Sequence, residues 1–180
     1  MGKSYRTIFI ILFLIIFCLC KSKSGQKLSQ KVMAKKIPDV ILYDFSYEFT
    51  NKDQPVWILY SKKAEVFKDD DIIKVDGVHL LFYKNGKQDS ILDSKFGEVR
   101  EREKILSAIS NVVLKTSDGS ILYTEILHWD DNISRLYTDE YIKIVRPNGD
   151  IIEGIGMEAD NNLEKLIIKR RVKGVIYEKK

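Results

Sequence analysis

Turn signals recur about every thirty residues along this chain, and stretches of alternating apolar and polar residues run between them. The Asn-Gly and Asp-Gly pairs end at Gly86, Gly119 and Gly149, which are 33 and 30 residues apart. Polar clusters alternate with these pairs at residues 69–71, 101–103, 130–132 and 160–162. Such pairs favour tight β-hairpin turns, and the β-branched and aromatic residues between them favour strands. The pattern predicts an all-β domain built as a stack of similar antiparallel hairpins.

The predicted strands share one apolar face when the successive rounds are aligned on their turns. Side chains alternate across a strand, so residues at matching positions point to the same side of the sheet. The larger residues on this face are Val66, Val78, Leu80, Phe82, Val99, Val112, Leu114, Leu127, Trp129, Ile142, Ile144, Met157 and Val175. Periodicity leaves two interpretations open. The face is either the closed core of a β-stack or the lining of a trough between two splayed sheets, which would hold an apolar ligand.

One strand of each of the first two rounds carries an interruption. Gly77 stands between two apolar stretches, which predicts a kink or a β-bulge at that position. Asn111 occupies the matching position one round later. We therefore expect the strands to bend there.

The N-terminus carries a short export or anchoring segment. Lys3 and Arg6 precede an uninterrupted apolar run of 13 residues, 8–20. As a helix this run is roughly 20 Å long, whereas a bilayer core is about 30 Å thick. The run has the length of a signal-peptide core. It is either an uncleaved signal anchor or a lipoprotein signal that is cleaved before Cys18 or Cys20, with that cysteine acylated.

Both interpretations tether the domain to a membrane and place it on the exported side. Six lysines and no acidic residue follow the apolar run within residues 21–36. The chain therefore divides into a signal anchor or lipoprotein signal at residues 1–20, a basic tether at residues 21–37, and a β-domain at residues 38–180.

The remaining composition excludes several kinds of site. The net charge of +4 is concentrated in the tether, so the pI of about 8.9 does not indicate a nucleic-acid surface. The β-domain has no cysteine, which excludes a disulfide or a cysteine metal site there. His79 and His128 are 49 residues apart and do not suggest a metal pair. No nucleophile elbow or phosphate-binding loop occurs. We therefore expect no cofactor and no enzyme activity, although paired carboxylates from separate strands stay an alternative.

Several stretches follow one another in an order that resembles the LptC family. They are DFSYEF at residues 44–49, PVWILYSKKAEVFKDDDIIKVDGVHLLFYKNG at residues 55–86, Gly97-Glu98, SDGSILYTEILHWDDN at residues 117–132, and IIEGIGMEADNNLEKLII at residues 151–168. With the short N-terminal segment, the resemblance covers roughly residues 8–177. The family consists of membrane-tethered periplasmic proteins of the lipopolysaccharide export bridge, with an OstA-like domain.

The resemblance implies a twisted antiparallel β-jelly roll at residues 38–180 that serves outer-membrane biogenesis from the inner membrane. It implies that the apolar face listed above lines a trough for lipopolysaccharide, which comes from an inner-membrane ABC transporter. A soluble periplasmic bridge protein of the same fold would receive the lipid by pairing with the last strand. The two edges available to partners would carry Tyr43, Phe45 and Tyr47 on the first strand and Ile167, Ile168, Val172 and Tyr177 on the last. The alternative is a tethered β-lipoprotein that binds a protein or polysaccharide and conducts no lipid.

Overall fold

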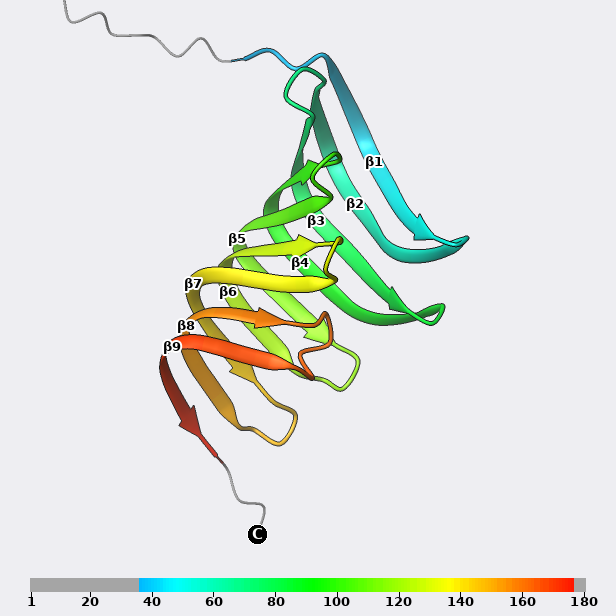
Figure 1. Cartoon of the computed structure of the whole chain (residues 1–180). Coiled ribbons are helices and arrows are strands. Elements are labelled where there is room, and N and C mark those ends of the chain that lie inside the picture. The colour runs from blue at the N-terminus through cyan, green and yellow to red at the C-terminus, as the bar shows by residue number, and fades with distance from the viewer. Residues whose placement is uncertain (1–35, 177–180) are drawn as a thin grey trace, which may run out of the picture. The chain divides into compact units, whose positions relative to one another are not determined.

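The computed structural model describes residues 36–176, and these residues form strands and turns throughout (Figure 1). The strands are β1 Val40–Asn51, β2 Gln54–Phe67, β3 Ile72–Lys84, β4 Lys87–Arg100, β5 Ile105–Thr116, β6 Ile121–Asp130, β7 Arg135–Val145, β8 Ile151–Ala159 and β9 Leu166–Val175. The Asn-Gly and Asp-Gly pairs and the polar clusters predicted as turns all lie at or within the connections between strands. The all-β prediction is confirmed.

The strands of the described region make one antiparallel sheet in sequence order, from β1 to β9. Each hairpin pairs with the next, so the sheet is a meander that does not close on itself. The expectation of a jelly roll is met only at the level of an antiparallel all-β sheet. Within residues 36–176, β1 pairs only with β2 and β9 only with β8. Both ends of the sheet are therefore unpaired edges.

A line of bends crosses the sheet midway along its strands. Residues with positive φ lie at these bends, namely Asp44, Gly77, Ser110, Asn111, Gly156 and Arg171. Shifts in the strand register accompany the bends in the later strands. An extra residue in one strand of a pair bends that strand and increases its twist. The predicted kinks at Gly77 and Asn111 are confirmed, since φ is +73° and +54° there.

The bends divide the sheet into two halves that face each other. The Gly-turn half comprises the strand ends next to the connections at residues 52–53, 85–86, 117–120 and 146–150. The acidic-turn half comprises the strand ends next to the connections at residues 68–71, 101–104, 131–134 and 160–165. Figure 1 shows the strands turning over at their bends. Phe82 from the Gly-turn half meets Trp129 from the acidic-turn half edge-to-face, with ring centroids 5.1 Å apart.

Apolar rows run across the strands on the inner surface of each half. One row of paired residues in the acidic-turn half is Val66, Ile73, Val99, Leu106, Trp129, Leu136, Ala159 and Leu166. A second row, in the Gly-turn half, is Leu59, Leu80, Leu92, Leu114, Leu122, Ile144 and Ile152. The two rows belong to one buried cluster or pack against it, so the core lies between the halves.

Candidate functional site

The space between the two halves, called the interior below, is the candidate site. Most of the residues predicted to line it are buried there: Val78, Leu80, Phe82, Val99, Val112, Leu114, Leu127, Trp129, Ile142, Ile144 and Met157. Val66 is partly buried and packs against the same cluster. The alignment of the rounds on their turns therefore places these side chains on one surface. Whether they bind a ligand stays a prediction.

Val175 is the exception, and its predicted placement is wrong. It pairs with Ile151 and is 53% exposed, whereas Gly174 takes the position opposite Ile152 in the inner row. The bend at Arg171, with φ of +51°, lies within this strand. One additional residue at a bend exchanges the faces of all residues that follow it. Aligning the rounds on their turns does not account for this shift.

The interior is filled by its own side chains. The inner-row leucines and isoleucines Leu80, Leu114, Leu122 and Ile144 have no measurable exposure. A cavity of about 40 Å³ near β1 is lined in part by Tyr47, Phe49 and Trp57. This volume holds little more than one water molecule. An apolar ligand could therefore enter only if the two halves move apart.

Separation of the halves would leave the backbone ladder intact. Within residues 36–176 the backbone–backbone hydrogen bonds join neighbouring strands or close turns, and none connects the two halves. The contacts across the opening involve side chains. At the β1 end the pKa of Tyr47 is raised to about 12, first by burial and then by the nearby Glu101 carboxylate in the opposite half. Separation of the halves would therefore not require any loss of strand pairing.

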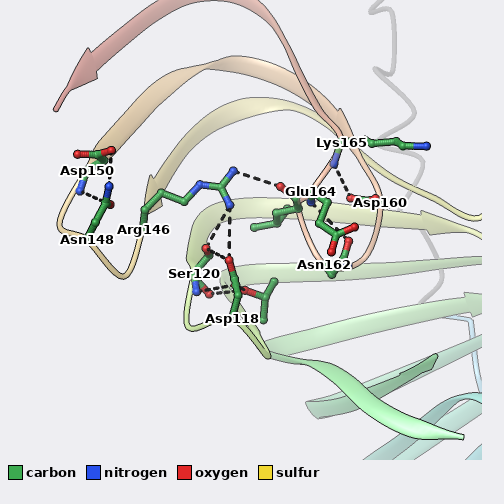
Figure 2. Close-up of polar contacts among 11 residues, drawn as sticks. Asp118, Ser120, Arg146, Asn148, Asp150, Asp160, Asn162, Glu164 and Lys165 are labelled. Carbon is green, nitrogen blue, oxygen red and sulfur yellow. Dashed lines mark hydrogen bonds and ion pairs between the residues drawn. The ribbon is translucent and has the colours of Figure 1, made fainter. Parts of the chain in front are cut away.

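At the opposite end, Arg146 connects the two halves (Figure 2). Its Nη1 donates to Ser120 Oγ at 3.1 Å and lies 4.0 Å from Asp118 Oδ2. Its Nη2 donates to the Leu163 carbonyl oxygen at 3.1 Å, in the loop between β8 and β9. The pKa of Asp118 is lowered, first by the Thr116 hydroxyl, with smaller contributions from Ser120 and Arg146. Asp118 therefore stays ionised and helps to position the guanidinium.

Sequence reasoning missed this cluster. Asp118 was identified only as a turn residue, and neither Arg146 nor Leu163 was singled out. One signal was available, because Leu163 is an apolar residue inside a polar cluster at residues 160–165. An apolar residue in such a loop is explained when the loop folds inward. Its partner Arg146 lies 17 residues away, and no local pattern connects the two.

The two edge strands carry the residues predicted to meet partners. On β1, Tyr43 is 73% exposed, whereas Phe45 and Tyr47 pack against the core. On β9, Ile167 and Val172 are exposed and Ile168 packs against the core. Tyr177 lies outside the described residues. Among residues 36–176 no other strand pairs with the outer side of β1 or β9, which is the geometry that strand addition requires.

The histidines lie apart from the interior. His79 Nδ1 is 2.8 Å from Asp93 Oδ1 on the exposed surface. His128 Nδ1 is 2.8 Å from Ser107 Oγ, and burial lowers the pKa of His128. Among residues 36–176, no group of histidine, cysteine and carboxylate side chains is arranged to hold a metal ion.

The N-terminal predictions fall on residues that the structure does not describe. The apolar run at residues 8–20, with Cys18 and Cys20, lies outside the described region, as does most of the basic tether. Within the described part of the chain, no helix has the length and apolar character needed to cross a membrane.

Comparisons with known proteins give one family and one fold. The family described as lipopolysaccharide-assembly, LptC-related, matches residues 7–178. No curated protein sequence matches the chain. Among solved structures, the chain is similar to LptH from Pseudomonas aeruginosa, described as the LptA-homologous periplasmic component of the conserved lipopolysaccharide transport device. The TM-score is 0.55 at 12% identity, and the match covers 72% of this chain and 100% of LptH. At this identity the likeness shows a shared fold.

Proposed function

Because this chain belongs to the LptC-related family of lipopolysaccharide-assembly proteins, we propose that it carries lipopolysaccharide through the periplasm with the acyl chains held in its interior. Proteins of this family are components of a transport bridge and not enzymes. The observation that carries the proposal is the continuous apolar inner surface, which crosses the strands between two unpaired edges. The lipid would therefore move across the strands, from one edge of the sheet toward the other.

The energy of exposing acyl chains explains why such a surface is needed. Each methylene group moved from a membrane into water costs about 0.8 kcal/mol, so one chain of about twelve carbons costs roughly 10 kcal/mol. An inner surface of Leu, Ile, Val and Phe side chains replaces the membrane around the chains. When the halves part, the lipid chains cover the apolar side chains that would otherwise meet water.

The proposal includes a direction and two protein partners. A retained signal anchor or an acylated Cys18 or Cys20 would hold the domain at the inner membrane. The β1 edge would face the subunits of an ABC transporter, and the β9 edge would pair with a soluble bridge protein of the same fold. The positive charge of β9 supports selective pairing with a partner strand at this edge. The strand carries Lys169, Arg170, Arg171 and Lys173 and no acidic residue.

The test of lipid passage is photo-crosslinking from the interior during transport in cells. A photoreactive phenylalanine at Ile144, which is fully buried, is expected to form adducts with lipopolysaccharide. The same probe at Lys143, the next residue, is expected to form few, because a shift of one position moves the side chain to the outer surface. Adducts are measured by immunoblotting of the purified chain. Equal labelling from both positions would contradict an interior path.

The second candidate function, a tethered protein with a permanently closed core, is favoured by the filled interior. In that case a functional chain with the probe at Ile144 or Leu114 gives no lipopolysaccharide adduct. The decisive control is that the probe-bearing chain still supports growth of a strain that depends on it. A functional chain without adducts would establish the closed core, and adducts would exclude it.

The cations of β9 provide a separate prediction about the partner. Among the described residues, Arg170, Arg171 and Lys173 have no ion-pair partner, so they are available to an incoming strand. The triple change Arg170→Glu, Arg171→Glu and Lys173→Glu is expected to weaken binding of the soluble bridge protein about tenfold or more, because rim and edge charges set partner choice. Affinity is measured by biolayer interferometry at two salt concentrations. Reversal of Lys62, Lys95 and Lys115, which are exposed and lie off the β9 edge, is the matched control.

A further inference from the structure

The loop between β8 and β9 differs from the other loops of the acidic-turn half. It has six residues, 160–165, whereas the connections at residues 68–71, 101–104 and 131–134 have four. Its Leu163 is fully buried in the core cluster, whereas Ile133, the apolar residue of the preceding connection, is 64% exposed. Asn162 is also buried. This loop therefore folds inward and covers the interior near the β9 edge.

The backbone of the loop is held in an unfavourable conformation. Leu163 has φ of +57°, in the left-handed region that residues with branched or bulky side chains seldom adopt. Its N–H donates to the Asp160 carbonyl at 3.1 Å, and its own carbonyl accepts from Arg146 Nη2. Such conformations persist only where surrounding contacts fix them. Arg146 supplies such a contact to Leu163 from the opposite half.

Like charges oppose the closed position of the loop. Asp89, at the start of β4 in the Gly-turn half, has a buried Oδ2 with no hydrogen-bond partner among the described residues. Burial raises the pKa of Asp89, Lys84 lowers it, and the carboxylates of Glu164 and Asp160 in the loop raise it. The loop carboxylates Glu164 and Asp160 therefore lie close enough to Asp89 for their negative charges to disfavour its ionised form. Burial of Leu163 and the hydrogen bond from Arg146 hold the loop closed, whereas these like charges oppose the closed position.

We propose that the β8–β9 loop is a gate over the interior at its β9 end, and that Arg146 is the positioning residue that latches it to Ser120 and Asp118. Release of the Leu163 carbonyl would withdraw the Leu163 side chain from the core and open the interior beside the edge strand. The claim that lipid passes the gate rests on the proposed function. The claim that Arg146 latches the loop does not depend on it.

The latch is tested by hydrogen exchange in the full chain. Arg146→Gln removes the charged donor, and because hydrogen bonds from charged groups are stronger than neutral ones, exchange of the Leu163 amide is expected to accelerate about tenfold or more. Arg146→Lys keeps the charge but lacks the planar guanidinium, which donates from both Nη atoms. An exchange rate between those of the parent chain and Arg146→Gln is expected. Mass spectrometry of peptides that cover residues 160–165 gives the rates.

The matched control is Arg102→Gln. Arg102 Nε lies 3.3 Å from Asp71 Oδ1 and joins two neighbouring turns of the same half, so its loss is expected to leave exchange at residues 160–165 unchanged. Unchanged exchange in Arg146→Gln would overturn the latch. Equal acceleration in every strand of Arg146→Gln would also overturn it, because Arg146 would then support the whole domain and not the loop.

A second measurement tests whether the gate controls lipid. With the photoreactive probe at Ile144, Arg146→Gln is expected to form lipopolysaccharide adducts faster than the parent chain. Leu163→Asn, which tolerates the left-handed backbone but removes the apolar side chain from the interior, is expected to do the same. Equal adduct rates in all three chains would exclude a gate for lipid. If no chain forms adducts, the proposed function fails, while the exchange experiment still decides whether Arg146 latches the loop.

Discussion

Leu114→Asp is expected to destabilise the domain strongly. Leu114 has no exposure and lies in the inner row between Leu92 and Leu122. A carboxylate at this position has no cation or donor to pair with and costs several kcal/mol to bury. We expect the free energy of unfolding to fall by about 4 kcal/mol or more, a large part of the roughly 5–15 kcal/mol that stabilises an ordinary domain. Urea denaturation followed by tryptophan fluorescence measures it, since Trp57 and Trp129 are both buried.

Lys115→Asp is the control for this prediction. Lys115 is the next residue on β5, and its side chain is exposed on the outer surface. The same new carboxylate there is expected to change the free energy of unfolding by no more than about 0.5 kcal/mol. Similar losses in both variants would mean that the two halves do not enclose the inner row, and the proposed path for lipid would lose its basis.

The hairpins and the inner rows were predictable because their signals are local. An Asn-Gly or Asp-Gly pair fixes a tight turn, and the period of two fixes the face of each following residue. The alignment that matched Val66 with Val99 and Trp129 agrees with the observed row, because these segments lie between similar turns. The unpaired edges, in contrast, were expected from the family resemblance and not from periodicity.

The folding of one sheet into two facing halves was not predictable from the same signals. The sequence interpretation considered two splayed sheets, whereas the described residues form a single sheet bent along one line. In β3 this line passes through a glycine, Gly77, which the sequence identifies as a bend. In β1 and β9 it passes through Asp44 and Arg171, which are not glycines. The displacement of Val175 and the contact between Arg146 and Leu163 both depend on how the halves meet. Such contacts arise from packing at long range, and alternation along a strand carries no information about them.

In the bent meander, the same apolar contacts stabilise the domain and hold its two halves together. Its backbone hydrogen bonds follow the sheet, so they do not resist separation of the halves, and the filled apolar interior holds the halves together instead. A ligand that supplies equivalent apolar surface replaces those contacts at little cost. If the halves part as proposed, the hydrogen bond from Arg146 to the Leu163 carbonyl oxygen has to break.

Gly154→Ala is expected to displace the β9 edge strand from β8. A Cβ atom on Gly154 would overlap Ile168 Cγ2 and lie 3.2 Å from the Arg170 carbonyl oxygen. Ile168 is β-branched and packs against the core, so its methyl group has little freedom to move. Overpacking of this kind costs about 1–3 kcal/mol, and the closeness of the clash favours the upper end. Urea denaturation gives the loss, and hydrogen exchange of β9 amides is expected to rise first.

Gly77→Ala separates this steric effect from backbone strain. Gly77 has φ of +73° and no atom within 4 Å of an added Cβ, so its cost comes from the left-handed backbone alone and is about 1–2 kcal/mol. A double-mutant cycle distinguishes the two causes. Ile168→Ala removes the clashing methyl group and is expected to offset part of the loss from Gly154→Ala, but none of the loss from Gly77→Ala. If Ile168→Ala and Gly154→Ala are additive, β8 and β9 do not meet as the structure has them, and the edge offered to a partner is a different one.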